Sequence, residues 1–366
     1  MENRQRNFLA FNCVCWFATR LTSAPAWIKG NRAYPTVPVA EFLGEVPSFV
    51  HTVLFYLFLL CLAAVALYPK RALLLAAVAI ELFACSLDVI RWQPFEFYFI
   101  FIFLLYAVNK ANTKAFYTIL LVVMASVYIY SGLHKFNGGF LYVVWENMIL
   151  KHLLGLTSLT IQEYHLHYLG LLIAAAEFGG GLALLVLRKK RLPILLLFAS
   201  HLFVLSMVFL NNYNYVIVPW NLAMIGGLLY LDLQLSDHKL YFAWSPGNVV
   251  IVLFTGILPF LSLFGYWDHF LSWCVYAGRT LSLDICIKES GPGALNKYIT
   301  NSDKRNVCNG SGKIPVVAWS VNDLQLIPYP EEWYYAKFKK EFEKMYPGVN
   351  ADFIIYSYPY KERKKI

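Results

Sequence analysis

Charged residues are scarce in this sequence. They make up 14% of the 366 residues, whereas hydrophobic residues make up 59%. Soluble globular domains are about a quarter charged, so this composition excludes an ordinary soluble domain and indicates that lipid surrounds most of the chain. The net charge is +9, but the basic residues stand in short clusters between apolar runs. Nucleic acid is therefore not an expected partner.

Metal-binding and redox motifs are also lacking. The seven cysteines have no metal-ligand or redox spacing, and Cys13 and Cys15 lie in an apolar segment where packing is the expected role. No small-residue cleavage site follows the first apolar stretch, so we expect no removed signal peptide. Cys286 and Cys308 would form a disulfide in an oxidising compartment, or would stay as two free thiols.

Long apolar runs dominate the rest of the sequence. A spanning helix needs about 20 apolar residues, because the hydrocarbon core is about 30 Å thick and a helix rises about 1.5 Å per residue. We expect an all-α multi-pass transmembrane helix bundle of about nine spans. They lie near residues 7–24, 47–68, 71–89, 95–109, 114–136, 163–187, 191–211, 214–231 and 247–266. The first contains Asn7, Asn12 and Arg20, so an amphipathic helix on the membrane surface is its alternative.

Basic residues in the connections predict the orientation. Starting in the cytoplasm places the richer connections on the cytoplasmic side, namely Arg4 and Arg6, Lys70 and Arg71, Lys110 and Lys114, Arg188 to Arg191, and Lys239. Cytoplasmic connections carry the excess of Lys and Arg. Nine crossings then leave the C-terminus outside, in the periplasm if the membrane is a bacterial inner membrane, which we favour.

The last hundred residues predict a small soluble domain. An aromatic amphipathic stretch, expected to be an interfacial helix, runs from Tyr266 to Trp273 and closes a transmembrane domain over 1–280. Beyond it, 314–320 and 352–358 have the pattern of strands. Residues 331–346 have the pattern of a helix, with acids in its first turn. We expect residues 281–366 to form a small α+β cap outside the cytoplasm.

Several polar side chains fall within the predicted spans, where their insertion into lipid is costly. Glu81 and Asp88 are seven residues apart and share one helix face, which must point into the bundle. Tyr128, Ser131 and Lys135 form a second polar stripe that ends at the outer surface. Each is a candidate functional residue unless a structural role accounts for it.

Two later spans add further polar groups. Glu177 precedes three glycines, 179–181, that allow another helix to approach closely. For Glu177 we favour helix packing with a protonated or paired acid. His201 adds a polar side chain on the same side of the bundle as Glu177. A single buried histidine is more often an interhelical hydrogen-bonding group than a catalyst.

Four charged residues are predicted near the outer membrane surface: Asp88, Arg91, Glu96 and Lys135. They would line one outward-facing cavity. Alternatively, Asp88 or Glu96 pairs with Arg91 or Lys135 to permit burial. The residues alone do not decide between a binding site and a structural ion pair.

A family resemblance bears on this region. The segment Ser131-Gly132-Leu133-His134-Lys135-Phe136-Asn137 resembles a motif of the HTTM superfamily, the membrane domain shared with vitamin K-dependent gamma-glutamyl carboxylase. Segments 88–97, 257–273 and, more weakly, 346–356 are similar to other family segments in the same order. The likeness covers residues 7 to about 280 and implies the same helical membrane fold.

The resemblance implies specific roles. The matching family lysine acts as a base on the outer side, which makes Lys135 the candidate base, and the cofactor would be a quinone or vitamin K-like lipid. The family's partner histidine would fall on or beside Phe95, where this chain has no histidine, and His134 points about 100° away from Lys135 on a helix. An outward, lipid-accessible cavity near Lys135 is therefore our first functional hypothesis. The alternative is a non-catalytic subunit that docks an envelope protein partner through its outer surface and tail.

Overall fold

The computed structural model describes residues 2–30, 32–211, 214–234, 241–288, 293–302, 307–310 and 312–366. The chain divides into two compact units. We call Met1–Thr22, Leu57–Ile80 and Pro94–Gly278 the helical unit, and Ser23–Tyr56, Glu81–Gln93 and Arg279–Ile366 the sheet unit. Lys239, one of the basic connector residues, lies outside the described residues.

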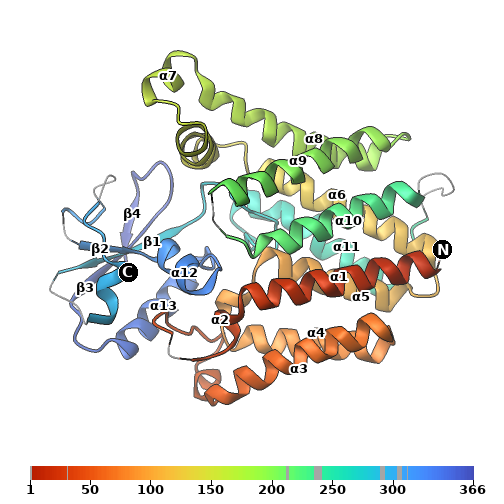
Figure 1. Cartoon of the computed structure of the whole chain (residues 1–366), viewed down its shortest axis with the longest axis horizontal. Helices are drawn as coiled ribbons and strands as arrows, with labels where there is room; N and C mark the ends of the chain where they lie inside the picture. The colour runs from red at the N-terminus through yellow and green to blue at the C-terminus, as the bar shows by residue number, and fades with distance from the viewer. Residues whose placement is uncertain are drawn as a thin grey trace. The chain divides into compact units, whose positions relative to one another are not determined.

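The helical unit is a bundle whose long helices run side by side (Figure 1). Its α-helices are α1 (Glu2–Thr22), α5 (Pro94–Asn109), α6 (Thr113–Leu133), α7 (Ser158–Glu163), α8 (Gly170–Val186), α9 (Arg191–Asn211), α10 (Ile217–Gln234) and α11 (Pro246–Val252). The shorter or irregular helices are η3 (Phe140–Leu153), η4 (Leu166–Leu169), η5 (Leu253–Ile257) and η6 (Leu258–Phe264). Two further helices, α3 (Ser48–Leu67) and α4 (Arg71–Ser86), have residues in both units.

Each of the nine predicted spans overlaps helical residues, which confirms a mostly helical chain but not nine crossings. The span predicted over 71–89 ends early, because α4 ends at Ser86, so Asp88 does not share a helix face with Glu81. Among the described residues, five helical stretches are long and apolar enough to cross a membrane: Ser48–Leu67, Thr113–Leu133, Leu166–Val186, Arg191–Asn211 and Pro246–Phe264. Helices α4 and α5 have 16 residues each and reach only about 24 Å at a rise of 1.5 Å per residue. The structure thus supports an integral membrane protein with at least these five candidate spans.

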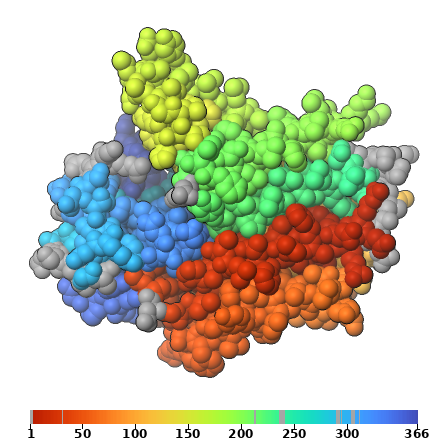
Figure 2. All heavy atoms as spheres, viewed as in Figure 1, coloured from red at the N-terminus to blue at the C-terminus, as the bar shows by residue number. Residues whose placement is uncertain are grey.

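Helix α1 packs into the bundle along its length. It lies beside α10, as the red and green surfaces in Figure 2 show. The Trp16 ring stacks on Phe99 with a centroid distance of 5.2 Å and meets Phe58 edge-on at 4.9 Å. Trp16 is fully buried, so the face of α1 that carries it is an interior face of the helical unit.

Glycines set the close packing of α6 against α8. A Cβ atom built at Gly181 would lie 2.8 Å from the carbonyl oxygen of Ala125 and 2.8 Å from the backbone nitrogen of Ile129. From the other side, a Cβ at Gly132 would collide with the backbone of Phe178. Small residues at such crossings let two helix backbones approach closely, which fixes how the polar residues of α6 face those of α8.

The sheet unit contains a four-stranded antiparallel sheet in its described residues, with strand order β2-β1-β3-β4. The strands are β1 (Ser282–Ile287), β2 (Gly312–Pro315), β3 (Ala351–Tyr356) and β4 (Arg363–Lys365). Its helices are α2 (Ala24–Trp27), η1 (Glu41–Glu45), η2 (Val89–Arg91), η7 (Gly293–Tyr298), α12 (Val316–Leu324) and α13 (Glu332–Met345). Basic residues on the edge strand β4 discourage pairing with another chain.

Aromatic side chains form the core of the sheet unit. Tyr34 packs against Trp319 and Phe338, with centroid distances of 5.2 Å to each. The Tyr34 hydroxyl also shares a 3.1 Å hydrogen bond with Tyr334. Burial raises the pKa of Tyr34 above its usual range. Residues far upstream of the predicted cap over 281–366 therefore contribute to this unit.

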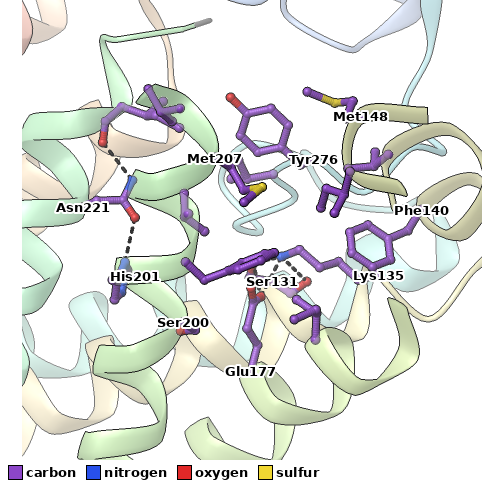
Figure 3. Close-up of a pocket in the computed structure, with 18 of the residues that line it drawn as sticks. Ser131, Lys135, Phe140, Met148, Glu177, Ser200, His201, Met207, Asn221 and Tyr276 are labelled. Carbon is purple, nitrogen blue, oxygen red and sulfur yellow. Dashed lines mark hydrogen bonds and ion pairs between the residues drawn. The ribbon is translucent and has the colours of Figure 1, made fainter. Parts of the chain in front are cut away.

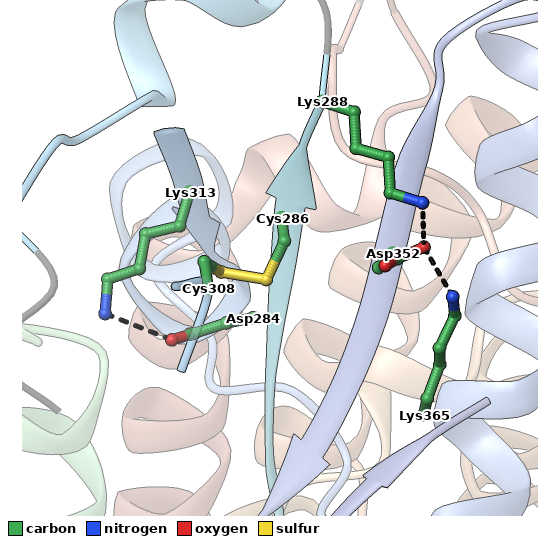
Figure 4. The surroundings of a disulfide bond; sticks show 7 residues. All are labelled: Asp284, Cys286, Lys288, Cys308, Lys313, Asp352 and Lys365. Atoms are coloured by element: carbon green, nitrogen blue, oxygen red, sulfur yellow. Dashed lines mark hydrogen bonds and ion pairs between the residues drawn. A yellow bond between two sulfur atoms is a disulfide. The ribbon is translucent and has the colours of Figure 1, made fainter. Parts of the chain in front are cut away.

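A disulfide joins Cys286 on β1 to Cys308, with Cα atoms 5.3 Å apart (Figure 4). On the neighbouring strand β3, the Oδ1 of Asp352 forms ion pairs with the Nζ of Lys288 at 2.9 Å and with the Nζ of Lys365 at 2.8 Å. Hydrogen bonds from Lys365 and then Lys288 hold the pKa of Asp352 below its usual value. These contacts tie three strands of the sheet together.

Two local predictions are wrong. The strand expected over 314–320 ends at Pro315, and α12 begins at Val316. Pro315 has no N–H for the ladder and is suited to start a helix. The interfacial helix expected after 266 consists of turns, because Gly265 ends η6 with a φ of 77° and the Asp268 side chain caps the backbone N–H of Leu271 at 2.8 Å. By contrast, α13 and β3 lie close to the predicted helix and second strand.

Candidate functional site

The helical unit contains a cavity of about 160 Å³ between α6, η3, α8, α9 and α10. Most of its wall is apolar and includes Phe140, Trp145, Met148, Phe203 and Met207. Its polar lining residues are Tyr128, Ser131, Lys135, Glu177, Ser200, His201, Asn211, Asn221 and Tyr276. An apolar cavity with a few convergent polar groups is the usual form of a small-molecule site.

Lys135, Glu177 and Ser131 form the main polar cluster of the cavity (Figure 3). The Lys135 Nζ lies 2.6 Å from the Glu177 Oε2 and 2.6 Å from the Ser131 Oγ. The Ser131 hydroxyl in turn donates to the same carboxylate oxygen at 2.8 Å. In Figure 3, Glu177 and Ser131 lie below the amine, and Met148 and Tyr276 lie above it.

The helices position this cluster. Ser131 lies in the last turn of α6, and the chain turns just beyond the helix end, where Lys135 donates back to the Ser131 carbonyl at 3.2 Å. Glu177 lies near the middle of α8, four residues before Gly181, whose contact with α6 holds the two helices together. The side chains of Lys135 and Glu177 are only 8% and 11% exposed, so each partly neutralises a charge that would be costly to bury alone.

A second hydrogen-bonded chain lines the same cavity and centres on His201. Its Nδ1 lies 2.7 Å from the Asn221 Oδ1, and its Nε2 lies 2.7 Å from the Tyr128 hydroxyl. Asn221 uses its amide group to donate to the Ile217 carbonyl at 2.8 Å, so its oxygen accepts. His201 therefore carries its proton on Nδ1 and accepts from Tyr128 through Nε2. Both ring nitrogens are engaged.

The cavity brings together five residues singled out in the sequence: Tyr128, Ser131, Lys135, Glu177 and His201. The pairing of Lys135 with Glu177 was not foreseen, because the expected partners were Asp88 and Glu96. Asn221 was noticed in the sequence as polar character on the same side of the bundle as His201, but was not named as a member of the site. Its only sequence signal is a polar side chain inside an apolar helical stretch.

Asp88 and Arg91 belong to the sheet unit. The Asp88 carboxylate binds Arg32 at 2.5 Å and accepts the backbone N–H of Val37 at 3.1 Å. Arg91 is buried over the Trp27 ring, and its Nη2 lies 2.7 Å from the Nδ1 of His51. Neither residue lines the cavity beside Lys135. Both hold together the loop and helix ends of their own unit.

Glu96 and Glu81 have structural partners elsewhere. Glu96, at the start of α5, accepts a hydrogen bond from Trp16 and lies 3.8 Å from the Arg20 guanidinium. Glu81 accepts from the Cys85 thiol at 3.2 Å, one turn along α4. These contacts account for two acids inside apolar helices without assigning them chemistry.

The structure also places His134, within the 131–137 segment, and Phe95, within the 88–97 segment. His134 shares a 3.1 Å hydrogen bond with Ser262 and does not line the cavity. Phe95 is buried with its ring 6.3 Å from that of Trp220, a cavity-lining residue. The histidine that the cavity does contain, His201, comes from a different helix.

No metal-binding cluster of three or more His, Cys, Asp or Glu side chains occurs among the residues that the structure describes. No family model, curated protein or solved structure matches this chain. The site is therefore interpreted from its own geometry.

Proposed function

We propose that this chain is a multi-pass membrane protein that binds a molecule with an apolar body and a small polar head, a quinone-like compound or another lipid, in the cavity beside Lys135. The observation that carries the proposal is the buried Lys135–Glu177 pair, 2.6 Å between Nζ and Oε2, in the wall of a mostly apolar cavity. The nine-span topology with a cytoplasmic N-terminus and an external tail belongs to the same proposal. So does the likeness to the carboxylase membrane domain.

The cavity volume limits the part of the ligand that it encloses. A cavity of about 150 Å³ accommodates one benzene ring, and this one is about 160 Å³. One ring-sized head therefore fits, and a longer apolar tail would leave between the lining helices. Apolar rings such as Phe140 and Trp145 would cover the faces of that head.

The polar cluster suits proton exchange with a bound head group. The Lys135 ammonium can donate a hydrogen bond to a ligand carbonyl. In its neutral form, the amine can accept the proton of a ligand hydroxyl, which leaves an ammonium that Glu177 stabilises at 2.6 Å. In this proposal Lys135 acts as the base and Glu177 takes the place of the family's histidine.

One observation favours the second candidate, a non-catalytic subunit that docks an envelope partner. An amine held by a carboxylate at 2.6 Å is less available as a base than an unpaired one. In that case, Lys135 and Glu177 would join α6 to α8, and function would lie on the outer surface and tail.

A cavity-filling variant tests the ligand. Val204 lines the cavity, and Val204→Phe would fill part of it without touching the ion pair, while Val186→Phe adds the same ring at an exposed α8 position. Decylubiquinone binding to the purified protein in detergent, followed by fluorescence quenching, should weaken about tenfold or more in Val204→Phe and stay unchanged in Val186→Phe. Equal binding in all three forms, or none in any, would reject the quinone-like ligand.

A further inference from the structure

The sheet unit contains a second cavity, of about 260 Å³, with a different chemical character. Its wall comes from the loop after α2, from η1, from the first turn of α3 and from the end of α13. Its ionisable lining residues are Lys29, Arg32, Tyr34, His51, Glu341 and Lys344. The cavity is independent of the site beside Lys135.

Positive charge is in excess in this cavity. Glu341 is already paired with Lys344, 2.7 Å away, and Asp88 is paired with the Nη2 of Arg32. Lys29 makes no hydrogen bond or ion pair within the described part of the chain. The cavity therefore has one cation more than its neighbouring acids neutralise.

Arg32 also presents an unused donor. Its two terminal nitrogens bind Asp88, Thr36 and backbone carbonyls, at 2.5 Å for Asp88 and 2.9 Å for Thr36. Its Nε is buried and has no hydrogen-bond partner among the described residues. A buried unsatisfied donor on a charged group costs stability unless something binds it.

His51 supplies a third donor through its fixed tautomer. Its Nδ1 lies 2.7 Å from the Nη2 of Arg91. A guanidinium group only donates, so this nitrogen accepts and the ring proton is on Nε2. Because His51 lines the cavity, its Nε2–H is available there as a donor.

Burial and the nearby Arg32 charge lower the pKa of Lys29 from its usual value. An anion bound in the cavity would offset both effects and favour the charged ammonium, because an opposite charge nearby stabilises it. Oxyanions such as phosphate, with several acceptor oxygens, match a set of Lys, Arg and His donors.

The position of the cavity indicates the source of the oxyanion. His51 lies in the first turn of α3, and Ser48–Leu67 is one of the helices able to cross a membrane. Beside it, Phe42 and Phe49 are 71% and 65% exposed. Large exposed apolar side chains at the start of a spanning helix are suited to contact with acyl chains, so a lipid is the expected source of the oxyanion.

We propose that this cavity binds the phosphate group of an anionic phospholipid, held by Lys29, the Nε of Arg32 and the Nε2 of His51. The acyl chains would lie against the exposed aromatic residues of η1 and α3. The site stabilises the sheet unit at the membrane surface and takes no part in the chemistry proposed at Lys135.

Three probes separate the phosphate from the chains. Binding of dihexanoylphosphatidylglycerol, dihexanoylglycerol and inorganic phosphate to the full chain in detergent would be measured by calorimetry. We expect the phospholipid to bind more tightly than either other probe. Equal affinity for inorganic phosphate would overturn the lipid source, and equal affinity for dihexanoylglycerol would overturn the oxyanion site.

Two variants test the named donors. Lys29→Gln removes the charge and should weaken phospholipid binding about tenfold, whereas Lys361→Gln, an exposed residue of the same unit, should not. His51→Asn keeps an acceptor for Arg91 but removes the Nε2–H, and it should weaken binding severalfold. Thermal unfolding checks that both variants fold, and unchanged phospholipid binding in the two folded variants contradicts the proposal.

Discussion

Replacing Lys135 by Met, a neutral side chain of similar length, should destabilise the helical unit more than removing a similar surface pair. At 2.6 Å and an effective dielectric constant of about 20, the attraction between Lys135 and Glu177 is about 6 kcal/mol before desolvation is subtracted. Removing one partner of a buried pair typically costs about 3–5 kcal/mol, because the other charge stays buried without compensation. We expect about 3 kcal/mol for Lys135→Met, since Ser131 still donates to the carboxylate.

The double variant distinguishes pairing from packing. Glu177→Gln alone leaves the ammonium without a counter-charge and should cost a similar amount. Lys135→Met combined with Glu177→Gln removes both charges and should cost about 1 kcal/mol, so the two losses are strongly non-additive.

A natural control exists in the same unit. Lys151 lies 2.6 Å from Glu146, the same distance as in the buried pair, but its side chain is 33% exposed. Lys151→Met should cost about 1 kcal/mol or less because solvent screens that pair. Unfolding in mixed detergent micelles, followed by circular dichroism, measures all four variants. A loss for Lys135→Met no larger than that for Lys151→Met would refute the reasoning.

Two further predictions concern packing and covalent structure. Gly181→Ala should lower the unfolding midpoint and separate α6 from α8, because its Cβ would lie 2.8 Å from the Ala125 carbonyl oxygen. Gly179→Ala, whose Cβ would have nothing within 4 Å, should be neutral or slightly stabilising. Thermal melts compare the two variants, and equal midpoints would contradict the packing argument. Replacing Cys286 and Cys308 by Ser should destabilise the sheet unit by about 3 kcal/mol, since the disulfide closes a loop with a separation of 22 residues. Limited proteolysis of the variant should then cut the sheet unit first. An unchanged cleavage pattern would contradict this prediction.

The sequence predicts the helices well because their signal is local. Each run of about 20 apolar residues indicates a helix without knowledge of its neighbours. Helix ends follow equally local chemistry, as where the Asn112 side chain caps α6 by accepting from the Ala115 N–H at 3.0 Å. The strand predicted beyond Pro315 failed because Val316 and Val317 favour strands, while the packing of α12 against β1 and β2 favours a helix there.

The composition of the sheet unit could not be predicted in the same way. The segments 23–56 and 81–93 lie far upstream of the C-terminal region: the Tyr346 hydroxyl donates to the Ala33 carbonyl, 313 residues away. No periodicity links them to it. Their role is visible only in contacts such as that of Tyr34 with Trp319 and Phe338. Local patterns carry no information on such long-range partners.

The sequence singled out most residues of the candidate site, but it did not predict which of them form ion pairs with one another. Lys135 and Glu177 each stand out as charged residues in apolar surroundings. Which acid meets which base depends on the faces of α6 and α8 that come into contact, and the glycines at 132 and 181 decide that contact. Asp88 was an equally plausible partner by sequence, but Arg32 and the Val37 N–H already satisfy it.

The two cavities differ in net charge, and that difference constrains their ligands. Beside Lys135, the amine and the Glu177 carboxylate sum to zero, so an anionic head group would be repelled by the carboxylate about as strongly as it is attracted by the ammonium. A neutral head with a carbonyl or hydroxyl oxygen is the better match. Beside Lys29, no acid offsets the ammonium within ion-pair distance in the described residues, so an anion is favoured. The same residue type thus indicates a neutral ligand in one cavity and a phosphate in the other, because the neighbouring acids differ.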